Sequence, residues 1–247
     1  MHFGARAHSL DEIEFLAEAD FAFAEIDWKD PHFLTTQLAE LAVLQDKYGI
    51  TYLAHGPNER DPFGVDEIIE VMGPTVCQLL DLAPELGITI HTQHLWLDPR
   101  FMRTEDIARK LELLETWMDH ANRAGVTLCI ENLSEHADHF TLAFQRLPEL
   151  CMTLDLGHGE ILSQPNAAFG FITSFPGRIR HVHLHDNHGG SDVKDDLHLP
   201  IGEGCIDFAA ILRELRAADY DGMFSFEVKL DHVEQSRNTI REMWEAT

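Results

Sequence analysis

The chain is short of positive charge. Its 247 residues hold 18 Lys plus Arg against 43 Asp plus Glu, which gives a formal net charge of −25 at pH 7. Such a field repels phosphate backbones and anionic membrane surfaces over long range. It argues against a protein that grips nucleic acid, unless bound cations invert the field locally. Most of the carboxylates are expected on solvated helix faces.

Paired cysteines and long apolar runs are also missing. The four cysteines form no CxxC pair, so the sequence indicates neither a disulfide framework nor a zinc ribbon. No apolar run approaches the length of a membrane span, and the first residues lack the basic flank and apolar core of a targeting signal. We therefore expect a cytoplasmic protein that is not attached to a membrane.

A glycine-rich phosphate loop is absent after the first predicted strand, where a doubly wound nucleotide-binding sheet would carry one. Short apolar runs instead alternate with longer amphipathic ones, and the latter have helix signals such as the Ser9–Glu12 capping box. The predicted strands are 2–7, 21–27, 50–55, 88–91, 126–131, 150–155, 179–186 and 223–228. Eight such strand–helix units favour a single-domain α/β fold over residues 1–247, a closed (β/α)₈ TIM barrel. An open doubly wound sheet is the alternative.

The segment 181–198, HVHLHDNHGGSDVKDDLH, is the most informative stretch. It holds five of the sixteen histidines and four aspartates. Side chains alternate across a strand, so His181, His183 and His185 share one face while Val182 and Leu184 share the other. Imidazole is the commonest metal ligand and carboxylates are oxygen ligands. This strand therefore indicates a metal-dependent active site.

Polar residues lie at the ends of most of the other predicted strands. Active sites of (β/α)₈ barrels are built at the C-terminal ends of the strands, so these side chains should meet at one mouth. Carboxylates that converge there would repel one another without cations, and mixed carboxylate–imidazole shells suit Mn²⁺, Zn²⁺, Fe²⁺ or Co²⁺. The candidates are His55, His91, Glu131, Asp155, His158, His183, Asp196, His198 and Glu227.

The side chains two residues before several of these candidates should form a layer beneath the site. This predicted layer is small or polar for the most part: Leu53, Thr89, Cys129, Thr153, His181 and Ser225. Three histidines near the mouth are interpreted either as ligands or as residues that support ligands: His94, His185 and His188. The remaining histidines singled out are assigned to surfaces or helices: His2, His32, His120, His136, His139 and His232.

Six motifs in this order carry a family resemblance: HGP (55–57), IENL (130–133), LDLGH (154–158), HVHLHDN (181–187), DLHLPIGEGCIDF (196–208) and FEVK (226–229). Over nearly the whole chain they resemble the xylose isomerase-like barrel superfamily, which comprises sugar isomerases and epimerases and also metal-dependent apurinic endonucleases. For the sugar-converting members, the resemblance implies a metal on Glu131, Asp155, His183 and Glu227. It also implies that the two glutamates move a proton between adjacent carbons. His158 would orient or polarise the substrate.

The endonuclease pattern is the alternative that the resemblance leaves open. It implies a three-zinc site, for which the further ligands fall on His55, His91, His158, Asp196 and His198. The net charge and the sparse Lys and Arg of the predicted mouth loops favour a small polyhydroxylated substrate over nucleic acid. The cofactor is expected to be Mn, Zn, Co or Mg, one to three ions per chain. A third alternative is a non-catalytic sugar- or metal-binding barrel.

Three smaller features carry two interpretations each, and a fourth departs from the family pattern. Glu25 and Asp27 could bind substrate hydroxyls, or Glu25 could pair with Arg6. Trp96 could stack on a sugar ring or be an ordinary loop aromatic. The 202–204 backbone could bind phosphate at a helix start, or it could form a simple turn. The family's epimerases commonly carry an arginine near this loop, where this chain has only Lys194, and this departure weighs against a standard free ketose.

Overall fold

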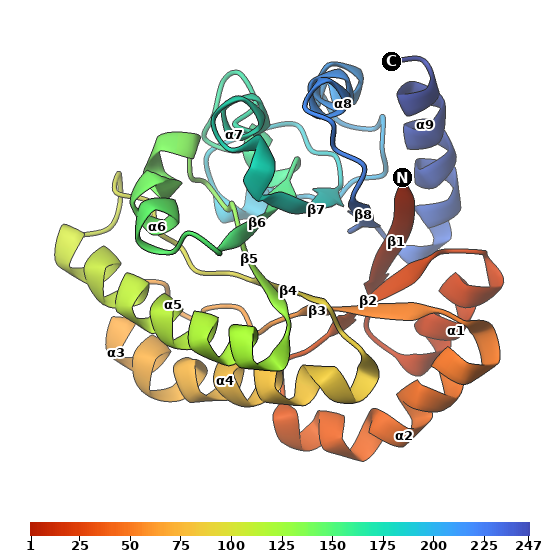
Figure 1. Ribbon diagram of the computed structural model, residues 1–247. Helices are drawn as coiled ribbons and strands as arrows, with labels where there is room; N and C mark the ends of the chain where they lie inside the picture. Colours follow the sequence, from red (N-terminus) through yellow and green to blue (C-terminus); the bar gives the residue numbers. More distant parts are fainter.

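The computed structural model describes the backbone of residues 1–247 and all side chains except that of Val193. Eight parallel strands pair in chain order, and β8 pairs with β1, so the sheet closes into a barrel (Figure 1). This confirms the predicted (β/α)₈ fold. The strands are β1 (His2–Ala7), β2 (Phe23–Asp27), β3 (Thr51–His55), β4 (Ile90–Gln93), β5 (Thr127–Glu131), β6 (Cys151–Asp155), β7 (Ile179–Leu184) and β8 (Met223–Phe226).

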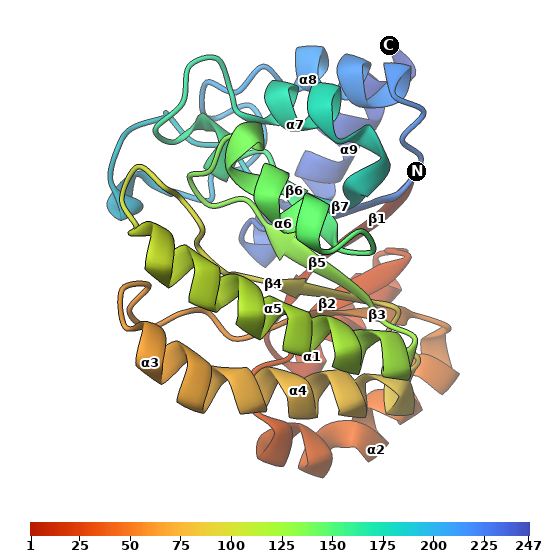
Figure 2. The same ribbon diagram turned by 60° about the vertical axis from the view of Figure 1, so that its left-hand side comes forward.

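Helices surround the barrel, and α4 and α5 lie side by side across its outer face (Figure 2). Ser9 caps the first helix by accepting from the Glu12 amide at 3.2 Å, as the capping box predicts. A π-helical turn, Ile68–Met72, joins α3 to α4. The helices are α1 (Leu10–Glu18), α2 (Pro31–Tyr48), α3 (Val65–Glu67), α4 (Gly73–Leu82), α5 (Thr104–Ala124), α6 (Thr141–Arg146), α7 (Ala168–Ser174), α8 (Phe208–Ala217) and α9 (Val233–Glu245).

Strand β4 begins two residues later than the sequence predicts. Gly87 adopts a left-handed conformation with φ of 64°, and the Ile88 amide donates to the Ala83 carbonyl in the same turn. This turn delays the strand to Ile90. The prediction that Thr89 faces the barrel interior is therefore wrong, because Thr89 is exposed. Thr92 takes that place, and its hydroxyl lies 2.7 Å from the Thr153 hydroxyl.

The barrel interior is divided along the strand direction. An apolar cluster fills the half near the strand N-termini, and Phe23, Leu53, Ile90, Cys129 and Cys151 form it. The larger apolar core lies between the barrel and its helices. The inward side chains beyond the small cluster are polar, so functional chemistry is confined to the C-terminal end of the strands.

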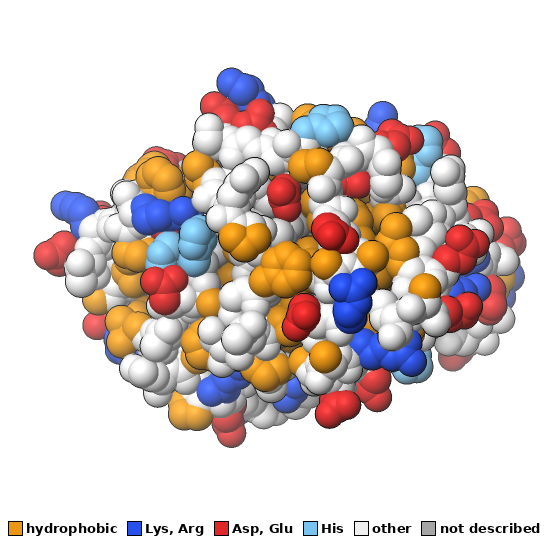
Figure 3. All heavy atoms as spheres, turned by 90° about the horizontal axis from the view of Figure 1, so that it is seen from above, with side chains coloured by type: hydrophobic (Ala, Val, Ile, Leu, Met, Phe, Trp, Pro, Cys, Tyr) orange, Lys and Arg blue, Asp and Glu red, His pale blue; other side chains and the backbone are white. Residues whose placement is uncertain are grey.

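The outer surface is polar and predominantly acidic in composition. Figure 3 shows acidic side chains dispersed among apolar and basic groups on the face seen from above, in keeping with the net charge of −25. Among the described helices, none combines the length and the apolar character needed to cross a bilayer.

Candidate metal and substrate site

Four predicted ligands meet at the barrel mouth. Glu131 and Asp155 end β5 and β6, His183 lies on β7 opposite Asp155, and Glu227 directly follows β8. One ligand atom from each of the four lies within 4.8 Å of the others. Glu131, Asp155 and His183 are fully buried, and the Glu227 side chain is 9% exposed. Strand pairing fixes the height of the first three, and the inward-facing alternation fixes their direction.

His183 is the centre of this group. Its Nδ1 lies 3.4 Å from Glu131 Oε1, 3.5 Å from Asp155 Oδ2 and 3.4 Å from Glu227 Oε1. Its Nε2 lies 3.0 Å from Glu25 Oε1 on β2. A proton donated from Nε2 to Glu25 leaves the Nδ1 lone pair facing three carboxylates, which is the arrangement of a metal-ligating histidine held by a carboxylate.

The site has unsatisfied polar atoms. His183 Nδ1 and Glu131 Oε1 are buried and lack a hydrogen-bond partner. Burial opposes a charged imidazole, yet Glu25, Glu227 and Glu131 outweigh burial and raise the pKa of His183 well above its usual value. Burial likewise opposes ionisation of Glu131, but His94 and His183 hold the pKa of that carboxyl well below its usual range. The group therefore binds positive charge strongly, whether as a proton or as a cation.

A second group lies beside the first and consists of His158, His185, Asp196 and His198. Asp196 Oδ2 lies 3.3 Å from His158 Nε2 and 3.1 Å from His198 Nε2. The two groups are connected, because His158 Nδ1 lies 3.1 Å from Glu131 Oε1 and His185 Nε2 lies 3.1 Å from Asp155 Oδ1. His185, one of the histidines with two interpretations, is thus a member of the second group.

The structure brings His55 to the mouth but not His91. His55 Nε2 lies 3.5 Å and His94 Nε2 lies 3.1 Å from Glu131 Oε2. His91 is buried and its Nε2 contacts Gln93 Oε1 at 3.2 Å, on the face of β4 opposite to Thr92. Among the described residues, His91 joins none of the groups that could hold a metal. The facing of β4 explains this: Ile90 and Thr92 point into the barrel, so His94 takes the next inward position, whereas His91 lies on the opposite face.

Arg6 is a site residue that sequence reasoning missed. It contacts Glu227 Oε1 through Nη1 at 3.2 Å, and its other terminal nitrogen pairs with Asp27. Asp27 also lies 2.9 Å from Lys29 Nζ. The alternative that Glu25 pairs with Arg6 is wrong, because Glu25 accepts a hydrogen bond from His183 and Arg6 pairs with Asp27 and Glu227. A sequence signal for Arg6 exists: alternate residues of β1 face into the barrel, and Arg6 is one of them, at the height of Glu25 on β2.

The 202–204 backbone forms a turn around a buried carboxylate. The amides of Gly202 and Gly204 each donate to Asp186 Oδ2 at 2.9 Å, and the Ile206 amide donates to Asp186 Oδ1 at 3.2 Å. These donors are already used, which supports the turn interpretation over a phosphate site. Lys194 is exposed and lies 3.4 Å from Asp192 Oδ2.

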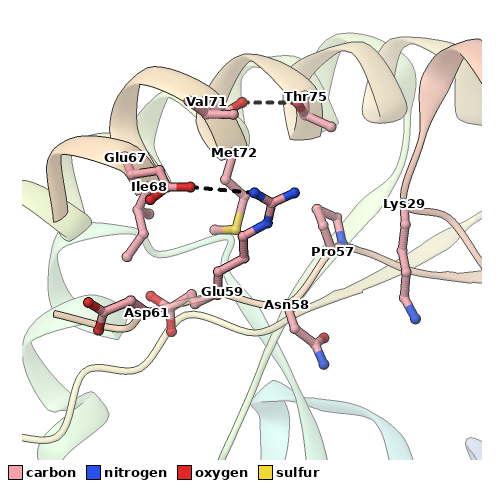
Figure 4. Close-up of a pocket in the computed structure, with 11 residues that line it drawn as sticks. Lys29, Pro57, Asn58, Glu59, Asp61, Glu67, Ile68, Val71, Met72 and Thr75 are labelled. Atoms are coloured by element: carbon pink, nitrogen blue, oxygen red, sulfur yellow. Dashed lines mark hydrogen bonds and ion pairs between the residues drawn. The ribbon is translucent and has the colours of Figure 1, made fainter. Parts of the chain in front are cut away.

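Two hollows border the mouth. The larger, of about 580 Å³, is lined by His94, His158 and Asp196 together with several aromatic and aliphatic side chains, so it opens from the site itself. The smaller, of about 170 Å³, lies between the 57–61 segment and the helices that follow it (Figure 4). Figure 4 shows Lys29 and Asn58 on its open side and Met72 on its helix side. None of the nine predicted ligands lines the smaller hollow.

Fold and mouth together define a (β/α)₈ barrel with a candidate divalent-metal centre. The sequence profile of the family described as "Xylose isomerase-like TIM barrel" matches residues 13–245, and the chain belongs to this family, as the motifs predict.

Similar proteins span nearly the whole chain. The uncharacterised protein MJ1311 of Methanocaldococcus jannaschii is 25% identical, over 94% of this chain and 84% of its own length. The solved structure of a D-tagatose 3-epimerase-like protein has 24% identity and a TM-score of 0.81, covering 100% of this chain and 98% of that one. An L-ribulose 3-epimerase (19%, TM-score 0.80, 100% and 95% covered) and a zinc-bound IolI protein (15%, TM-score 0.77, 100% and 99% covered) share the fold.

Proposed function

We propose that the protein is a divalent-metal-dependent isomerase or epimerase that acts on a small polyhydroxylated carbonyl compound. The observation that carries the proposal is the unpartnered, buried Nδ1 of His183, which faces three carboxylates at 3.4–3.5 Å. Sugar epimerases among the structures of the same fold support the choice of substrate class.

Glu131, Asp155, His183 and Glu227 fit a divalent cation, because three carboxylates and one correctly oriented imidazole supply suitable donor atoms. The zinc in the similar IolI structure is consistent with such a site. When bound, the cation supplies polarisation of a carbonyl and of the hydroxyl beside it. The proton on the His183 group in the metal-free protein would leave on binding.

Glu131 and Glu227 are the proposed acid–base pair. Burial opposes ionisation of Glu227, yet His183 and Arg6 lower its pKa, so both glutamates are ionised and able to accept a proton. One would take the proton from the carbon next to the carbonyl, and the other would return a proton to the product. Arg6 orients Glu227, and His94 at 3.1 Å orients Glu131.

His158 is positioned to hold the substrate beside this pair. Its Nδ1 contacts Glu131 Oε1 at 3.1 Å and its Nε2 reaches Asp196 at 3.3 Å. Its neighbours Asp155, Asp196 and Glu131 outweigh burial and raise the pKa of His158 well above its usual value. A protonated His158 would donate to a substrate oxygen if its Nε2–H exchanged the contact with Asp196 for one with the substrate.

The test follows proton exchange, so the product of the reaction need not be identified. Protein reconstituted with Mn²⁺, Co²⁺, Mg²⁺ or Zn²⁺ is incubated with a panel of ketoses in D₂O, and NMR detects deuterium at carbons adjacent to the carbonyl. We expect exchange in the wild type and none in Glu131→Gln, whereas Glu85→Gln, at an exposed position, behaves as wild type. Exchange that persists in Glu131→Gln would overturn the assigned role.

A metal-dependent phosphoesterase is the second candidate, favoured by the second group around Asp196. Two to three zinc ions per chain and hydrolysis of bis(p-nitrophenyl) phosphate would support it. The mouth offers little for a nucleic acid, however. Arg6 is occupied by Asp27 and Glu227, Lys29 by Asp27, and Lys194 by Asp192. A non-catalytic binding barrel would take up metal and sugar but show neither exchange nor hydrolysis.

A further inference from the structure

We infer that the substrate carries a planar apolar substituent, such as a phenyl aglycone, attached to its polyhydroxylated part. Its binding site would be the larger hollow, here called the aromatic slot and defined by Phe63, Trp96, Phe101, Leu133, Ile161 and Leu162. The inference rests on the proposed function, because the slot opens from His94, His158 and Asp196 at the candidate metal site.

The size of the slot indicates a substrate larger than one sugar ring. Its volume of about 580 Å³ lies within the range of roughly 300–1,000 Å³ for pockets that enclose drug-sized ligands. The reacting part of the substrate would lie at the buried ligand group, outside most of this volume. The slot therefore has room for a second cyclic group.

The aromatic wall of the slot is left open to solvent. Phe63 and Phe101 are 60% and 48% exposed, which makes them two of the most exposed large apolar side chains. Both rings contact Trp96, Phe101 in a stacked geometry at 5.5 Å and Phe63 edge-on at 5.4 Å. Clustered aromatic surface of this kind is costly in water and is typical of a binding site.

Trp96 is held in place by hydrogen bonds to the protein before any ligand binds. Its indole Nε1 donates to Ser134 Oγ at 2.8 Å, and its amide donates to Glu59 Oε2 at 2.8 Å. The buried Lys110 bonds the Trp96 carbonyl at 3.0 Å and pairs with Glu59. The wall is therefore rigid before a ligand arrives, which lowers the entropic cost of binding.

The polar groups of the slot favour an apolar substituent over a second sugar. Glu59 and Ser134 are engaged with Lys110, Trp96 and Asp98. His94, His158 and Asp196 lie at the end that adjoins the candidate metal site, and the other polar side chains of the lining, Asn58, Arg60, Ser191 and Asp192, are exposed. A second sugar ring would bury hydroxyls without partners, and each such group costs about 1–3 kcal/mol. For a phosphate, the lining offers one basic side chain, Arg60, which is 88% exposed and lies 3.8 Å from Glu67 Oε1.

The experiment compares three ligands by calorimetry on the metal-loaded protein: the 3-keto derivatives of phenyl β-D-glucopyranoside, methyl β-D-glucopyranoside and methyl β-cellobioside. We expect the phenyl compound to bind about 10-fold or more tightly than the methyl compound, because burial of the ring removes its apolar surface from water. Phe63→Ala and Phe101→Ala should reduce that ratio several-fold. Phe33→Ala, at a 57% exposed position on α2, should leave it unchanged.

Equal affinity for the phenyl and methyl compounds, or tightest binding of the cellobioside, would overturn the inference. Deuterium exchange on the same compounds separates the two proposals. Exchange without a phenyl preference refutes the slot and leaves the isomerase proposal intact. A phenyl preference that depends on Phe63 and Phe101, without exchange, supports the slot while refuting the isomerase proposal.

Discussion

The two halves of the barrel interior are built from the same strands and have opposite chemistry. On β5, Cys129 belongs to the apolar cluster and Glu131, two residues on, belongs to the ligand group. On β2, Phe23 packs in the cluster while Glu25 holds His183. One step of two residues therefore separates a half that stabilises the fold from a half that concentrates repelling carboxylates. We call the apolar half near the strand N-termini the lower half and the half with the candidate ligands the upper half. The lower half must supply the stability on which the site depends.

The largest expected effect comes from breaking the upper half at Asp155, which lies between the two candidate ligand groups. In Asp155→Asn we expect metal binding to be lost and deuterium exchange to fall by about 10³-fold or more, because a bound cation supplies several kcal/mol of catalysis. The metal-free variant should remain folded but lose stability near neutral pH, because His158 and His185 outweigh burial and hold the pKa of Asp155 well below its usual value, so that the ionised carboxylate contributes to stability. Metal content by plasma mass spectrometry and urea unfolding measure the two effects. A variant that unfolds readily yet retains its metal would contradict this division.

A substitution in the lower half should lower the stability of the protein without loss of metal or of deuterium exchange. Leu53 is buried in the apolar cluster two residues before His55. Leu53→Ala leaves a cavity and should lower the free energy of unfolding by about 2–5 kcal/mol. Metal content and exchange of the folded variant should stay close to wild type. Loss of metal from protein that is still folded would show that the two halves are not separable.

The pH dependence of stability sharpens the same comparison. Burial lowers the pKa of His181 to about 4, deep in the barrel, whereas Asp196 and Glu227 outweigh burial and raise the pKa of His198 at the mouth to about 9. The unfolded chain has a histidine pKa of about 6.5. His181 therefore contributes stability above pH 6.5 that is lost as the pH falls toward 4. His198 contributes stability below pH 6.5 that is lost as the pH rises toward 9.

Metal-free protein should accordingly be most stable near pH 6.5, as urea unfolding at a series of pH values will measure. The acid-side loss from His181 could reach roughly 3 kcal/mol, because one pKa unit corresponds to about 1.4 kcal/mol. His181→Phe should reduce the loss on the acid side only, where burial also lowers the pKa of His91 to about 4, and His198→Gln should reduce the loss on the alkaline side only. If the pH dependence of the free energy of unfolding is the same in His181→Phe as in the wild type, the contribution of His181 is refuted. The same holds for His198 and His198→Gln.

The sequence predicts the barrel because its signals are local. The Ser9–Glu12 cap and the αL glycine at position 49 act within one turn, and strand alternation then fixes which side chains face inward. The same alternation brings Glu131 to the mouth. It fails on β4, where the sequence predicts that Thr89 and His91 face the barrel interior, whereas Ile90 and Thr92 do so and His94 reaches the mouth.

Partners across the barrel could not be predicted in this way. The contact of Glu25 with His183 joins residues 158 positions apart, and that of Arg6 with Glu227 joins residues 221 apart. No local pattern encodes such pairs, because they depend on closure of the sheet and on the relative height of its strands. The hydrogen-bonded partners of the ligands were therefore harder to predict than the ligands themselves.

The smallest predicted effect tests whether one of those partners belongs functionally to the upper half. Glu25→Gln keeps an acceptor for the His183 Nε2 proton but removes the negative charge that makes Nδ1 a better donor to a metal. We expect Mn²⁺ or Zn²⁺ affinity, measured by calorimetry, to fall by about 10–100-fold while the fold is retained. Glu14→Gln, a glutamate that contacts only Lys47 and Tyr48 among the described side chains, is the matched control. Unchanged affinity in Glu25→Gln would mean that Nδ1 of His183 is not a metal ligand. The two halves of the barrel interior would then differ in polarity but not in metal binding.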